Sequence, residues 1–400
     1  MSYVDKLREK DLNDGQIRFI VSPVSSASLL GVPGCGKSTA IAEYVIHKKE
    51  LNILKDKEIF CVCFGKQAQE SLLKKMKGFN MVGYVRTFDS LCEEFLNKNN
   101  LGMTRPPNYD ILSDDKKTMF HNEIRRKCKI FMEDIHTNID FWKGLKLIIV
   151  DEAQDMNSID FNIINCIRKK LNNVHLILIG DPNQCIFSSM RLSSAKYLLS
   201  HDKNVYMLEN NYRSTPEIVK FSEYFQNMKN SMISSSNFTG PLPKYFTSNC
   251  YINTDNHIIK FIKESISNGT EPKNIVILTT KREQNSNFGK LFKRKGIDIK
   301  YNNFNNNIKN PKNGVNLMTY WKAKGLEWDI VICYDFHNDF RTESKLMNNI
   351  KFVGVTRAKK ELYIYYNSIS TKKYNGRILL NKECSIIDTI PEELYEREDI

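Results

Sequence analysis

The feature that most limits how this chain can fold is a series of short, almost uninterrupted apolar runs separated by helix-like stretches. Apolar strands of this kind are typical of a parallel sheet covered by helices on both faces. The runs fall into two groups, in residues 1–204 and 205–400, which predicts two α/β domains in series. The runs include IFCVCF (59–64), LKLIIVD (145–151), VHLILIG (174–180), NIVILTT (274–280), GVNLMTY (314–320), DIVICYDF (329–336) and ELYIYY (361–366).

Composition narrows the possible classes of protein. The hydrophobic fraction of 41% is enough for large cores and excludes a disordered or collagen-like chain. An excess of 59 Lys and Arg over 46 Asp and Glu gives a net charge of +13, which favours a polyanionic partner such as nucleic acid. No uncharged apolar run reaches the ~18 residues of a membrane span, and the N-terminus lacks the apolar core of a secretory signal.

A glycine-rich loop carries the strongest local signal. The letters GVPGCGKS, from Gly31 to Ser38, fit the pattern G-x-x-x-x-G-K-[ST], between a short apolar stretch and the helical pattern TAIAEYVIHKK. In such a loop the backbone N–H groups wrap phosphates, Lys37 reaches the β- and γ-phosphates, and the Ser38 hydroxyl ligates Mg²⁺. A chance glycine-rich turn is the alternative. The predicted nucleotide-binding residues here are Gly31, Val32, Pro33, Gly34, Cys35, Gly36, Lys37, Ser38 and Thr39.

A second signal is LIIVDEAQD, in which an apolar strand ends in adjacent carboxylates. P-loop enzymes place a metal-directing Asp and a water-positioning residue in this way. We therefore expect Asp151 to hold Mg²⁺ and Glu152 to orient and deprotonate the attacking water. In isolation the same letters are also compatible with a solvated acidic turn after a strand.

Seven further motifs follow the pattern of one family in order. Together with DEAQD they resemble superfamily 1 helicases of the UvrD/Rep type, from about residue 12 to residue 366. The resemblance implies two tandem RecA-like P-loop domains with parallel sheets flanked by helices. The motifs are LNDGQ (12–16), CFGKQAQESL (63–72), RTFDSL (86–91), GDPNQCIF (180–187), NYRST (211–215), MTYWKAKGLEW (318–328) and VGVTRAKKELYI (353–364).

The resemblance assigns roles around ATP in both domains. In the first domain, Gln16 is expected to read the adenine edge and Gln184 to sense the γ-phosphate, beside the catalytic Lys37 and Glu152. In the second domain, Tyr212 is expected to stack on the base. An arginine supplied to a P-loop site stabilises transition-state charge.

The same resemblance predicts nucleotide contacts for four other residues of the second domain. Arg213 and Arg357 are expected to reach the γ-phosphate as paired arginine fingers, and Gly325 and Glu327 to approach the phosphate and ribose. A solvated surface charge is the commonest fate of an arginine and is the alternative for both.

The resemblance also predicts a track for a single nucleic-acid strand. Its expected contacts are Phe64, Thr87, Phe88, Phe187, Thr319, Trp321 and Lys322. The chain departs from the family here: F-S-S-M-R follows Ile186 where a Tyr and then Trp-Arg-Gly are usual, and Trp321 stands where a His is usual. Stacking is therefore missing or has moved to Trp321, unless Phe187 and Trp321 are ordinary core aromatics.

The spacing of the motifs leaves little room for accessory domains. The insertion in the first domain is expected to be small and helical, at about residues 96–143, with IRRKCK (124–129) as a phosphate-contacting face or a solvated one. The Asn-rich segment 301–313 reads as a loop, so the large second accessory domain of the family is expected to be absent. The acidic tail PEELYEREDI is expected to be exposed or frayed.

These inferences lead to one expected function and several alternatives. The chain is expected to be an ATP hydrolase and DNA helicase that uses ATP and Mg²⁺ at the interdomain cleft to step along single-stranded nucleic acid in the 3′→5′ direction. DNA is favoured over RNA as its partner, possible protein partners act in replication or repair, and no membrane partner is expected. Scattered cysteines without a C-x-x-C pair favour a reducing compartment, such as the cytoplasm or wherever the genome is handled.

The alternatives come from inside and outside the motor class. An RNA helicase or remodeller of superfamily 1 is the nearest of them. A P-loop phosphotransferase leaves NYRST unexplained. A non-catalytic scaffold is expected to have lost Lys37, Glu152 or Arg357, and all three are present.

Overall fold

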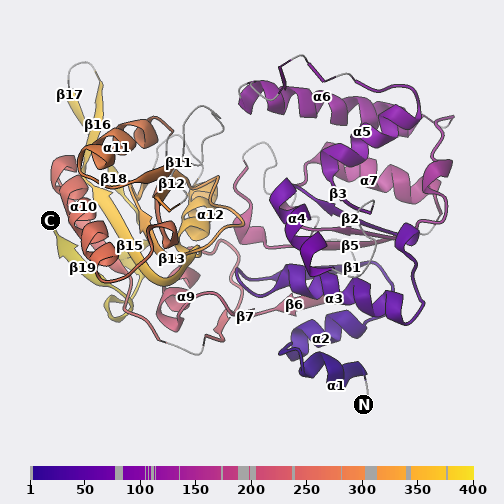
Figure 1. Cartoon of the computed structure of the whole chain (residues 1–400), viewed down its shortest axis with the longest axis horizontal. Coiled ribbons are helices and arrows are strands. Elements are labelled where there is room, and N and C mark those ends of the chain that lie inside the picture. The colour runs from indigo at the N-terminus through magenta and orange to yellow at the C-terminus, as the bar shows by residue number, and fades with distance from the viewer. Residues whose placement is uncertain are drawn as a thin grey trace. The chain divides into compact units, whose positions relative to one another are not determined.

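The computed structural model divides the chain into two compact units, residues 1–209 (the first unit) and 210–400 (the second unit), shown in Figure 1. Each unit is described by itself. The structure describes residues 3–76, 84–103, 105–106, 108–109, 112, 114–134, 136–172, 174–187, 198, 204–236, 239–280, 282–301, 313–338, 344–374 and 377–400.

The first unit is built on a parallel sheet of six strands in the order β3-β2-β4-β5-β1-β6. Its strands are β1 (Ala27–Gly31), β2 (Ile59–Cys63), β3 (Val85–Thr87), β4 (Leu147–Val150), β5 (His175–Gly180) and β6 (Val205–Leu208). The central strands β1, β2 and β4 are buried along their whole length, which explains their near-continuous apolar sequence.

Helices cover both faces of this sheet. They are α1 (Tyr3–Arg8), α2 (Asp14–Val21), α3 (Lys37–Glu50), α4 (Lys66–Lys75), α5 (Phe88–Lys98), α6 (Asp114–Glu133) and α7 (Ser158–Lys170). The helices α5, α6 and α7 share one core with alternate strand residues such as Phe60 and Val62. Because successive strand residues point to opposite faces, Cys61 and Cys63 of the same strand face the other helix layer.

The helix α3 carries a lysine whose charge is buried. Lys48 is 1% exposed, its Nζ donates to the carbonyl oxygen of Ile20 at 3.0 Å, and it lies 4.7 Å from the centre of the Tyr44 ring. Burial lowers the pKa of Lys48 to about 8 from its ordinary value of 10.5. The folded first unit is therefore destabilised by this ammonium at neutral pH.

This burial predicts a stability difference that depends on pH. Between about pH 8 and 10.5 the unfolded chain holds the Lys48 proton and the folded chain does not, so stability rises with pH in that window. Relative to Lys48→Met, the wild-type free energy of unfolding is expected to rise across the window by at most about 3 kcal/mol. Urea unfolding followed by fluorescence at pH 7, 9 and 10.5 measures this change. Lys57→Met, at an exposed lysine, is the control, and parallel pH profiles for wild type and Lys48→Met would contradict the prediction.

The second unit contains a parallel sheet of seven strands in the order β11-β12-β10-β13-β15-β9-β19. These strands are β9 (Lys244–Ser248), β10 (Ile275–Thr279), β11 (Ile299–Tyr301), β12 (Val315–Thr319), β13 (Trp328–Cys333), β15 (Ala358–Asn367) and β19 (Glu396–Asp399). Among the residues that the structure describes, three short two-stranded pairs accompany the sheet: β7 (Asn210–Asn211) with β8 (Ile233–Ser234), β14 (His337–Asn338) with β18 (Lys382–Glu383), and β16 (Ile369–Tyr374) with β17 (Arg377–Leu380).

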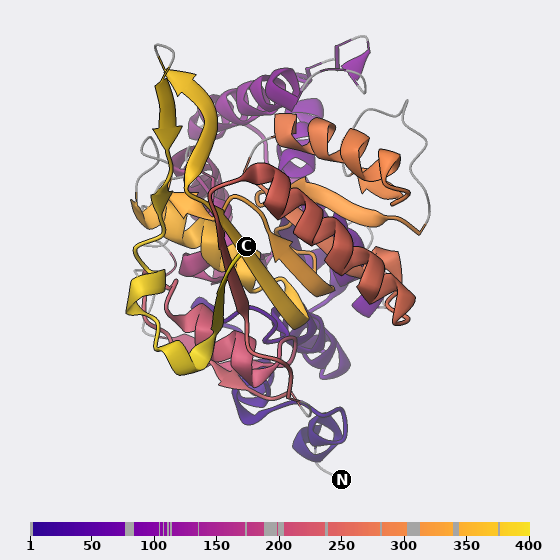
Figure 2. The same ribbon diagram turned by 90° about the vertical axis from the view of Figure 1, so that its left-hand side faces the viewer.

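In the described part of the second unit, four helices pack on the sheet. They are α9 (Pro216–Glu223), α10 (Tyr251–Ser267), α11 (Arg282–Arg294) and α12 (Ser344–Val355). Figure 2 shows α10 and α11 side by side across one face, where Ile258 and Phe292 join a core with Ile277 and Ile332. Among the described residues, no helix combines the length and the apolar character that crossing a bilayer requires.

The predicted α/β class with parallel sheets flanked by helices is confirmed, and all seven quoted apolar runs contain strands. The tail that was expected to be exposed or frayed is exposed but not frayed: β19 pairs in parallel with β9, and Lys244 Nζ lies 3.1 Å from Glu396 Oε2 across that pair. The side chains of β19 are exposed, which explains its polar sequence at a sheet edge. Most of the Asn-rich segment, residues 302–312, lies outside the described residues.

Candidate functional site

Three neighbouring strands of the first unit end at the predicted nucleotide motifs. The order β4-β5-β1 places Asp151, Asp181 and the glycine-rich loop after adjacent strands. The carboxyl ends of parallel strands lie at the same edge of a sheet, where ligands of open α/β sheets bind. The topology therefore brings together motifs that are about 30 to 140 residues apart in sequence.

The glycine-rich loop leads into an uncapped helix. Gly34 and Gly36 have left-handed φ values of 70° and 79°, and a Cβ built at Gly36 would lie 2.6 Å from Gln16 Nε2. Gly36 precedes the 14-residue helix α3 and supplies no side-chain cap. The first N–H groups of a helix have no acceptor within it, so this end of α3 suits an anion such as a phosphate. Ser38 lies in that first turn, and the Thr39 hydroxyl accepts from Lys75 Nζ at 2.6 Å.

Lys37 lies over the loop that precedes it. Its Nζ donates to the carbonyl oxygens of Gly31 at 2.8 Å and Val32 at 3.2 Å. Burial pushes the pKa of Lys37 down, yet neighbouring acidic groups outweigh it and raise the pKa overall. These groups are Cys35, Asp181, Glu152 and Asp151. The structure thus brings the predicted phosphate-binding lysine together with both predicted carboxylates.

Gln16 ties the start of α2 to the glycine-rich loop. Its side chain and that of Asn13 form a capping box at this helix end, in which Gln16 Oε1 accepts from the Asn13 N–H at 3.1 Å. Gln16 Nε2 donates to the carbonyl oxygen of Cys35 at 3.1 Å, and the residue is 3% exposed. The Gln16 amide, which is predicted to read adenine, therefore lies next to the loop, and both its oxygen and its nitrogen are hydrogen-bonded to the protein backbone.

A chain of hydrogen bonds connects the carboxylates at the ends of β4 and β5. Glu152 Oε2 accepts from Gln154 Nε2, and Gln154 Oε1 accepts from the Asp181 N–H at 3.1 Å. Asp181 Oδ2 in turn accepts from Gln184 Nε2 at 2.8 Å. Glu152 has a left-handed φ of 54°, which is uncommon for a non-glycine residue and marks a sharp turn directly after Asp151. The predicted base is thus positioned by backbone geometry and by a buried amide.

Burial acts in opposite directions on the pKa values of two charged groups of this site: it pushes the pKa of Lys37 down and that of Asp181 up. It raises the pKa of the Asp181 carboxyl, while the Lys37 charge and the Gln184 amide partly counteract that rise. Asp181 and Gln184 both lie at the 3-10 turn Pro182–Gln184 and are buried. Gln184, the predicted γ-phosphate sensor, therefore contacts a carboxylate beside Lys37.

In the second unit, an ion-paired arginine joins two predicted motifs. Arg213 Nε donates to Glu327 Oε2 at 2.7 Å, and Arg213 Nη1 donates to the carbonyl oxygen of Thr356 at 3.1 Å. Lys359 Nζ lies 3.0 Å from Glu327 Oε1. Burial raises the pKa of Glu327, but the Arg213 and Lys359 charges outweigh it and lower the pKa overall. Glu327 is therefore ionised and holds Arg213 in place.

Arg357 is the largest fully buried side chain of the described residues. Its Nε donates to the carbonyl oxygen of Val353 at 2.9 Å and its Nη1 to that of Leu326 at 3.3 Å. Its Nη2 donates to the Thr356 hydroxyl at 3.1 Å. Within the second unit this guanidinium is engaged with protein acceptors, so neither predicted arginine finger is a solvated surface charge here.

Two other predicted nucleotide contacts of the second unit are exposed. The Tyr212 side chain is 43% exposed, as a stacking residue requires. Gly325 has a left-handed φ of 80° and is exposed in the turn that precedes Glu327. The structure therefore brings Arg213, Arg357 and Glu327 together and leaves Tyr212 accessible beside Arg213.

Two predicted strand contacts of the first unit, Phe64 and Phe88, form a stack in which only Phe64 is accessible. Phe64 and Phe88 lie parallel, with ring centres 5.9 Å apart, and Phe88 is 1% exposed while Phe64 is half-buried. Thr87 caps α5, because its hydroxyl accepts from the Ser90 N–H at 3.2 Å. Phe88 is therefore a core residue in this structure, and Phe64 is the ring of this pair that can meet a base.

The remaining predicted strand contacts differ in accessibility. Phe187 is 37% exposed, whereas Thr319, at the end of β12, is 6% exposed. Trp321 and Lys322 are both half-buried in the turn that follows. The alternative of an ordinary core aromatic therefore does not describe Phe187.

Gln154 and Arg125 connect residues of different motifs, and neither of them was singled out from the sequence. Gln154 is completely buried and links Glu152 to Asp181. Arg125 is 9% exposed, although its motif was expected to be a phosphate-contacting or solvated face. Its position beside the buried stripe of Ile124 and Cys128 on α6 is the sequence signal that marks it.

These features define a P-loop protein with a second α/β unit, and known families match the same segments. An AAA domain model matches residues 18–189, and models of UvrD-like helicase C-terminal domains match residues 206–306 and 314–365. The chain belongs to the UvrD/Rep type of superfamily 1 helicases.

Individual proteins show the same likeness over different lengths. The chain is 25% identical to a "Putative ATP-dependent DNA helicase" of Acanthamoeba polyphaga mimivirus, over 91% of this chain and 54% of that protein. It is 22% identical to a "Probable DNA helicase II homolog" of Mycoplasma capricolum, over 72% of this chain and 51% of that protein. A stretch of 97 residues is 37% identical to the RecBCD enzyme subunit RecB of Buchnera aphidicola, covering 24% of this chain and 8% of that subunit. The chain thus spans about half the length of two of these relatives and a small part of the third.

Proposed function

We propose that this chain is an ATP-dependent translocase on single-stranded DNA, acting as a 3′→5′ helicase. The observation that carries the proposal is the convergence of the glycine-rich loop, Glu152 and Asp181 at the ends of three adjacent strands. The names of the relatives, which are DNA helicases, support DNA as the polymer. Proteins of replication or repair are proposed as further partners.

The chemistry assigned to the first unit follows from its groups. The uncapped start of α3 and the Lys37 ammonium bind the phosphates of ATP, and Gln16, which is hydrogen-bonded to the glycine-rich loop, contacts the base. Mg²⁺, held by Ser38 and Asp151, would neutralise charge on the phosphates. Glu152 takes the proton of the attacking water, and Gln154 fixes the direction of its carboxylate.

The second unit contributes arginines to the same reaction. Arg213 and Arg357 stabilise the charge that develops on the γ-phosphate, and Tyr212 stacks on the base. Because these groups belong to a different unit from the loop, hydrolysis depends on the two units acting together. That dependence converts ATP turnover into stepping along the strand.

The test compares ATP hydrolysis by the full chain with oligo(dT), with oligo(U) and without a polymer. We expect oligo(dT) to stimulate hydrolysis more than oligo(U). Tailed duplexes then report polarity, and only those with a 3′ single-stranded tail on the tracking strand are expected to open. Greater stimulation by oligo(U) would favour an RNA remodeller, and transfer of phosphate to an acceptor without stimulation would favour a phosphotransferase.

Salt dependence provides a separate prediction for strand binding. Each phosphate neutralised by a Lys or Arg is expected to contribute about −0.7 to the slope of log affinity against log salt concentration. With several such contacts, the oligo(dT) affinity is expected to fall steeply between 50 and 200 mM salt, as measured by fluorescence anisotropy. A slope of magnitude below about one would show that the basic excess is not directed at the strand.

A further inference from the structure

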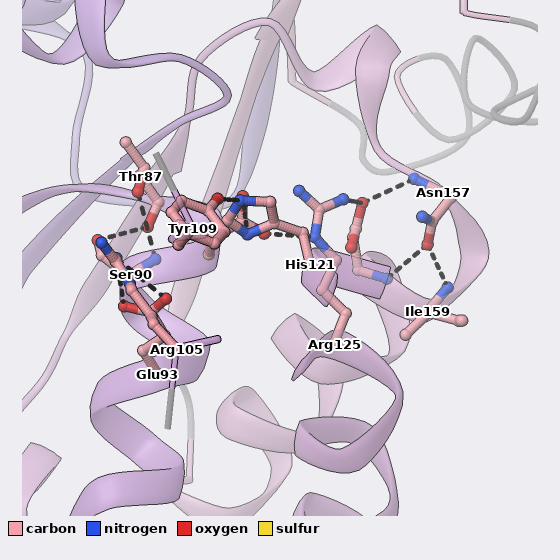
Figure 3. Close-up of polar contacts among 11 residues, drawn as sticks. Thr87, Ser90, Glu93, Arg105, Tyr109, His121, Arg125, Asn157 and Ile159 are labelled. Atoms are coloured by element: carbon pink, nitrogen blue, oxygen red, sulfur yellow. Dashed lines mark hydrogen bonds and ion pairs between the residues drawn. The ribbon is translucent and has the colours of Figure 1, made fainter. Parts of the chain in front are cut away.

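The helix α6, within the small insertion of the first unit, carries a buried cation between two other helices. Arg125 Nε donates to Asp89 Oδ1 at 2.7 Å, in the first turn of α5, and Arg125 Nη1 donates to Asp160 Oδ2 at 3.3 Å, in the first turn of α7. Figure 3 shows Arg125 with His121 on one side and Asn157 on the other. One guanidinium therefore bridges two helices that follow different motifs.

The α5 side of this bridge belongs to the predicted strand-contacting segment. Asp89 directly follows Thr87 and Phe88, and its Oδ2 lies 3.2 Å from His121 Nδ1. The Arg125 guanidinium also lies 5.3 Å from the centre of the Phe88 ring, on which Phe64 stacks. A base that stacked on the half-buried Phe64 would therefore press on Phe88, which contacts Arg125 directly.

The α7 side of the bridge leads to the predicted catalytic base. Asp160 Oδ2 accepts from the Asn157 N–H at 3.0 Å as well as from Arg125, so the same carboxylate caps α7 and receives the bridge. Only Met156 separates Asn157 from the 3-10 turn Ala153–Asp155, and Glu152 precedes that turn with its left-handed φ. The start of α7 and Glu152 are thus joined by a short, tightly turned backbone segment.

The two ends of the bridge are unequal. The contact with Asp89 is short, while the contact with Asp160 is longer by 0.6 Å and uses one carboxylate oxygen. The other oxygen of Asp160, Oδ1, is buried and has no hydrogen-bond partner among the described residues. Asp160 Oδ1 is therefore an acceptor that can make the contact with Arg125 bidentate.

We propose that Arg125 is a positioning residue that couples occupancy of the strand-contacting segment to the placement of Glu152. Strand binding at Phe64 moves the Arg125 guanidinium toward Asp160, and the contact between Arg125 and Asp160 becomes bidentate. The start of α7 then shifts and brings the turn at Glu152 into the position needed for hydrolysis. The inference rests on the proposed function, because it requires hydrolysis that a single strand stimulates. Arg125 itself contacts neither ATP nor the strand in this scheme.

The test measures ATP hydrolysis by the full chain, with and without saturating oligo(dT), for wild type, Arg125→Lys and Arg126→Lys. Lysine keeps the charge but cannot bridge two carboxylates with a planar fork. Arg126 is the matched control, because it is exposed and pairs with Glu123 on its own helix at 2.8 Å. For Arg125→Lys we expect the strand-stimulated kcat to fall about tenfold. The unstimulated rate and the oligo(dT) affinity are expected to stay within about twofold, and Arg126→Lys to match wild type.

A second variant covers the case in which Arg125→Lys does not fold, as judged by circular dichroism. Asp89→Asn keeps the shape of a partly exposed side chain and weakens the same bridge from the α5 end. It is expected to lower the stimulated kcat in the same direction. In the double variant Arg125→Lys/Asp89→Asn, the two losses are expected not to add, since both break one bridge.

The outcomes separate this inference from the proposed function. Wild-type hydrolysis that no single strand stimulates would refute the proposed function. Stimulation of wild type that is retained in full by both Arg125→Lys and Asp89→Asn would overturn the role of Arg125 alone. A weaker oligo(dT) affinity with an unchanged kcat, or an equal fall in both rates, would also overturn it, because either result assigns Arg125 to binding or to folding.

Discussion

Glu152→Gln is expected to bind ATP as wild type does and to lose about a thousandfold in strand-stimulated kcat, the range that removal of a general base produces. The glutamine keeps the size of the side chain and the left-handed turn at this position, so the glycine-rich loop and Lys37 are not disturbed. The amide cannot accept the proton of the attacking water. The loss is therefore expected in the hydrolysis step alone.

Nucleotide affinity and turnover must be measured together for this variant. A fluorescent ATP analogue gives the affinity, and phosphate release with saturating oligo(dT) gives kcat. Glu50→Gln, at an exposed carboxylate that ends α3, is the matched control and is expected to behave as wild type. A Glu152→Gln variant that hydrolyses ATP at the wild-type rate would show that another group is the base.

Arg213→Gln is expected to keep its affinity for oligo(dT) and to lose about a thousandfold in stimulated kcat. An arginine that stabilises transition-state charge in P-loop NTPases is worth about 10³–10⁵ in rate. Arg213 is the better of the two predicted fingers to change, because Glu327 keeps its Lys359 partner when the guanidinium is removed. Its loss should therefore leave the second unit folded.

A control for Arg213→Gln tests whether the loss of any positive charge in the second unit lowers kcat. Lys360→Gln removes a neighbouring exposed cation that pairs with Asp329 at 2.9 Å, and it is expected to retain wild-type kcat. Arg357 is less suited to truncation, since Arg357→Ala would leave the carbonyl oxygens of Val353 and Leu326 without this donor in a buried environment. An unchanged stimulated kcat in Arg213→Gln would exclude the finger role for that residue.

Much of the fold could be predicted because its strands are buried on both faces. Runs such as LKLIIVD and NIVILTT are almost continuously apolar because both faces of their strands are buried, and each run contains a strand of a parallel sheet. The strand β19 was missed because it lies at a sheet edge and its side chains are exposed, so its sequence is polar. Periodicity cannot identify a strand that buries only its backbone.

The candidate site was predictable to the extent that its motifs are local. The glycine-rich loop and DEAQD are each contiguous in sequence, and they follow β1 and β4, two strands that only β5 separates, so they lie at the same edge of the parallel sheet. The hydrogen bonds that orient the site are not local. Gln16 contacts Cys35, and Arg125 contacts both Asp89 and Asp160, across separations of 19 to 36 residues. Such partners depend on packing that a single sequence does not display.

The central place of β1 in its sheet governs how the first unit can be made. This strand is complete by residue 31, yet its two neighbours are β5, paired through Ala27 and Ile177, and β6, paired through Ser28 and Val205. During synthesis, the chain must therefore hold an apolar strand without partners until more than 140 further residues have emerged. Pairings of such sequence separation slow folding and expose apolar segments to aggregation. We expect fragments that stop before residue 204 to be poorly soluble, and synthesis of the chain to benefit from chaperones that bind unpaired strands.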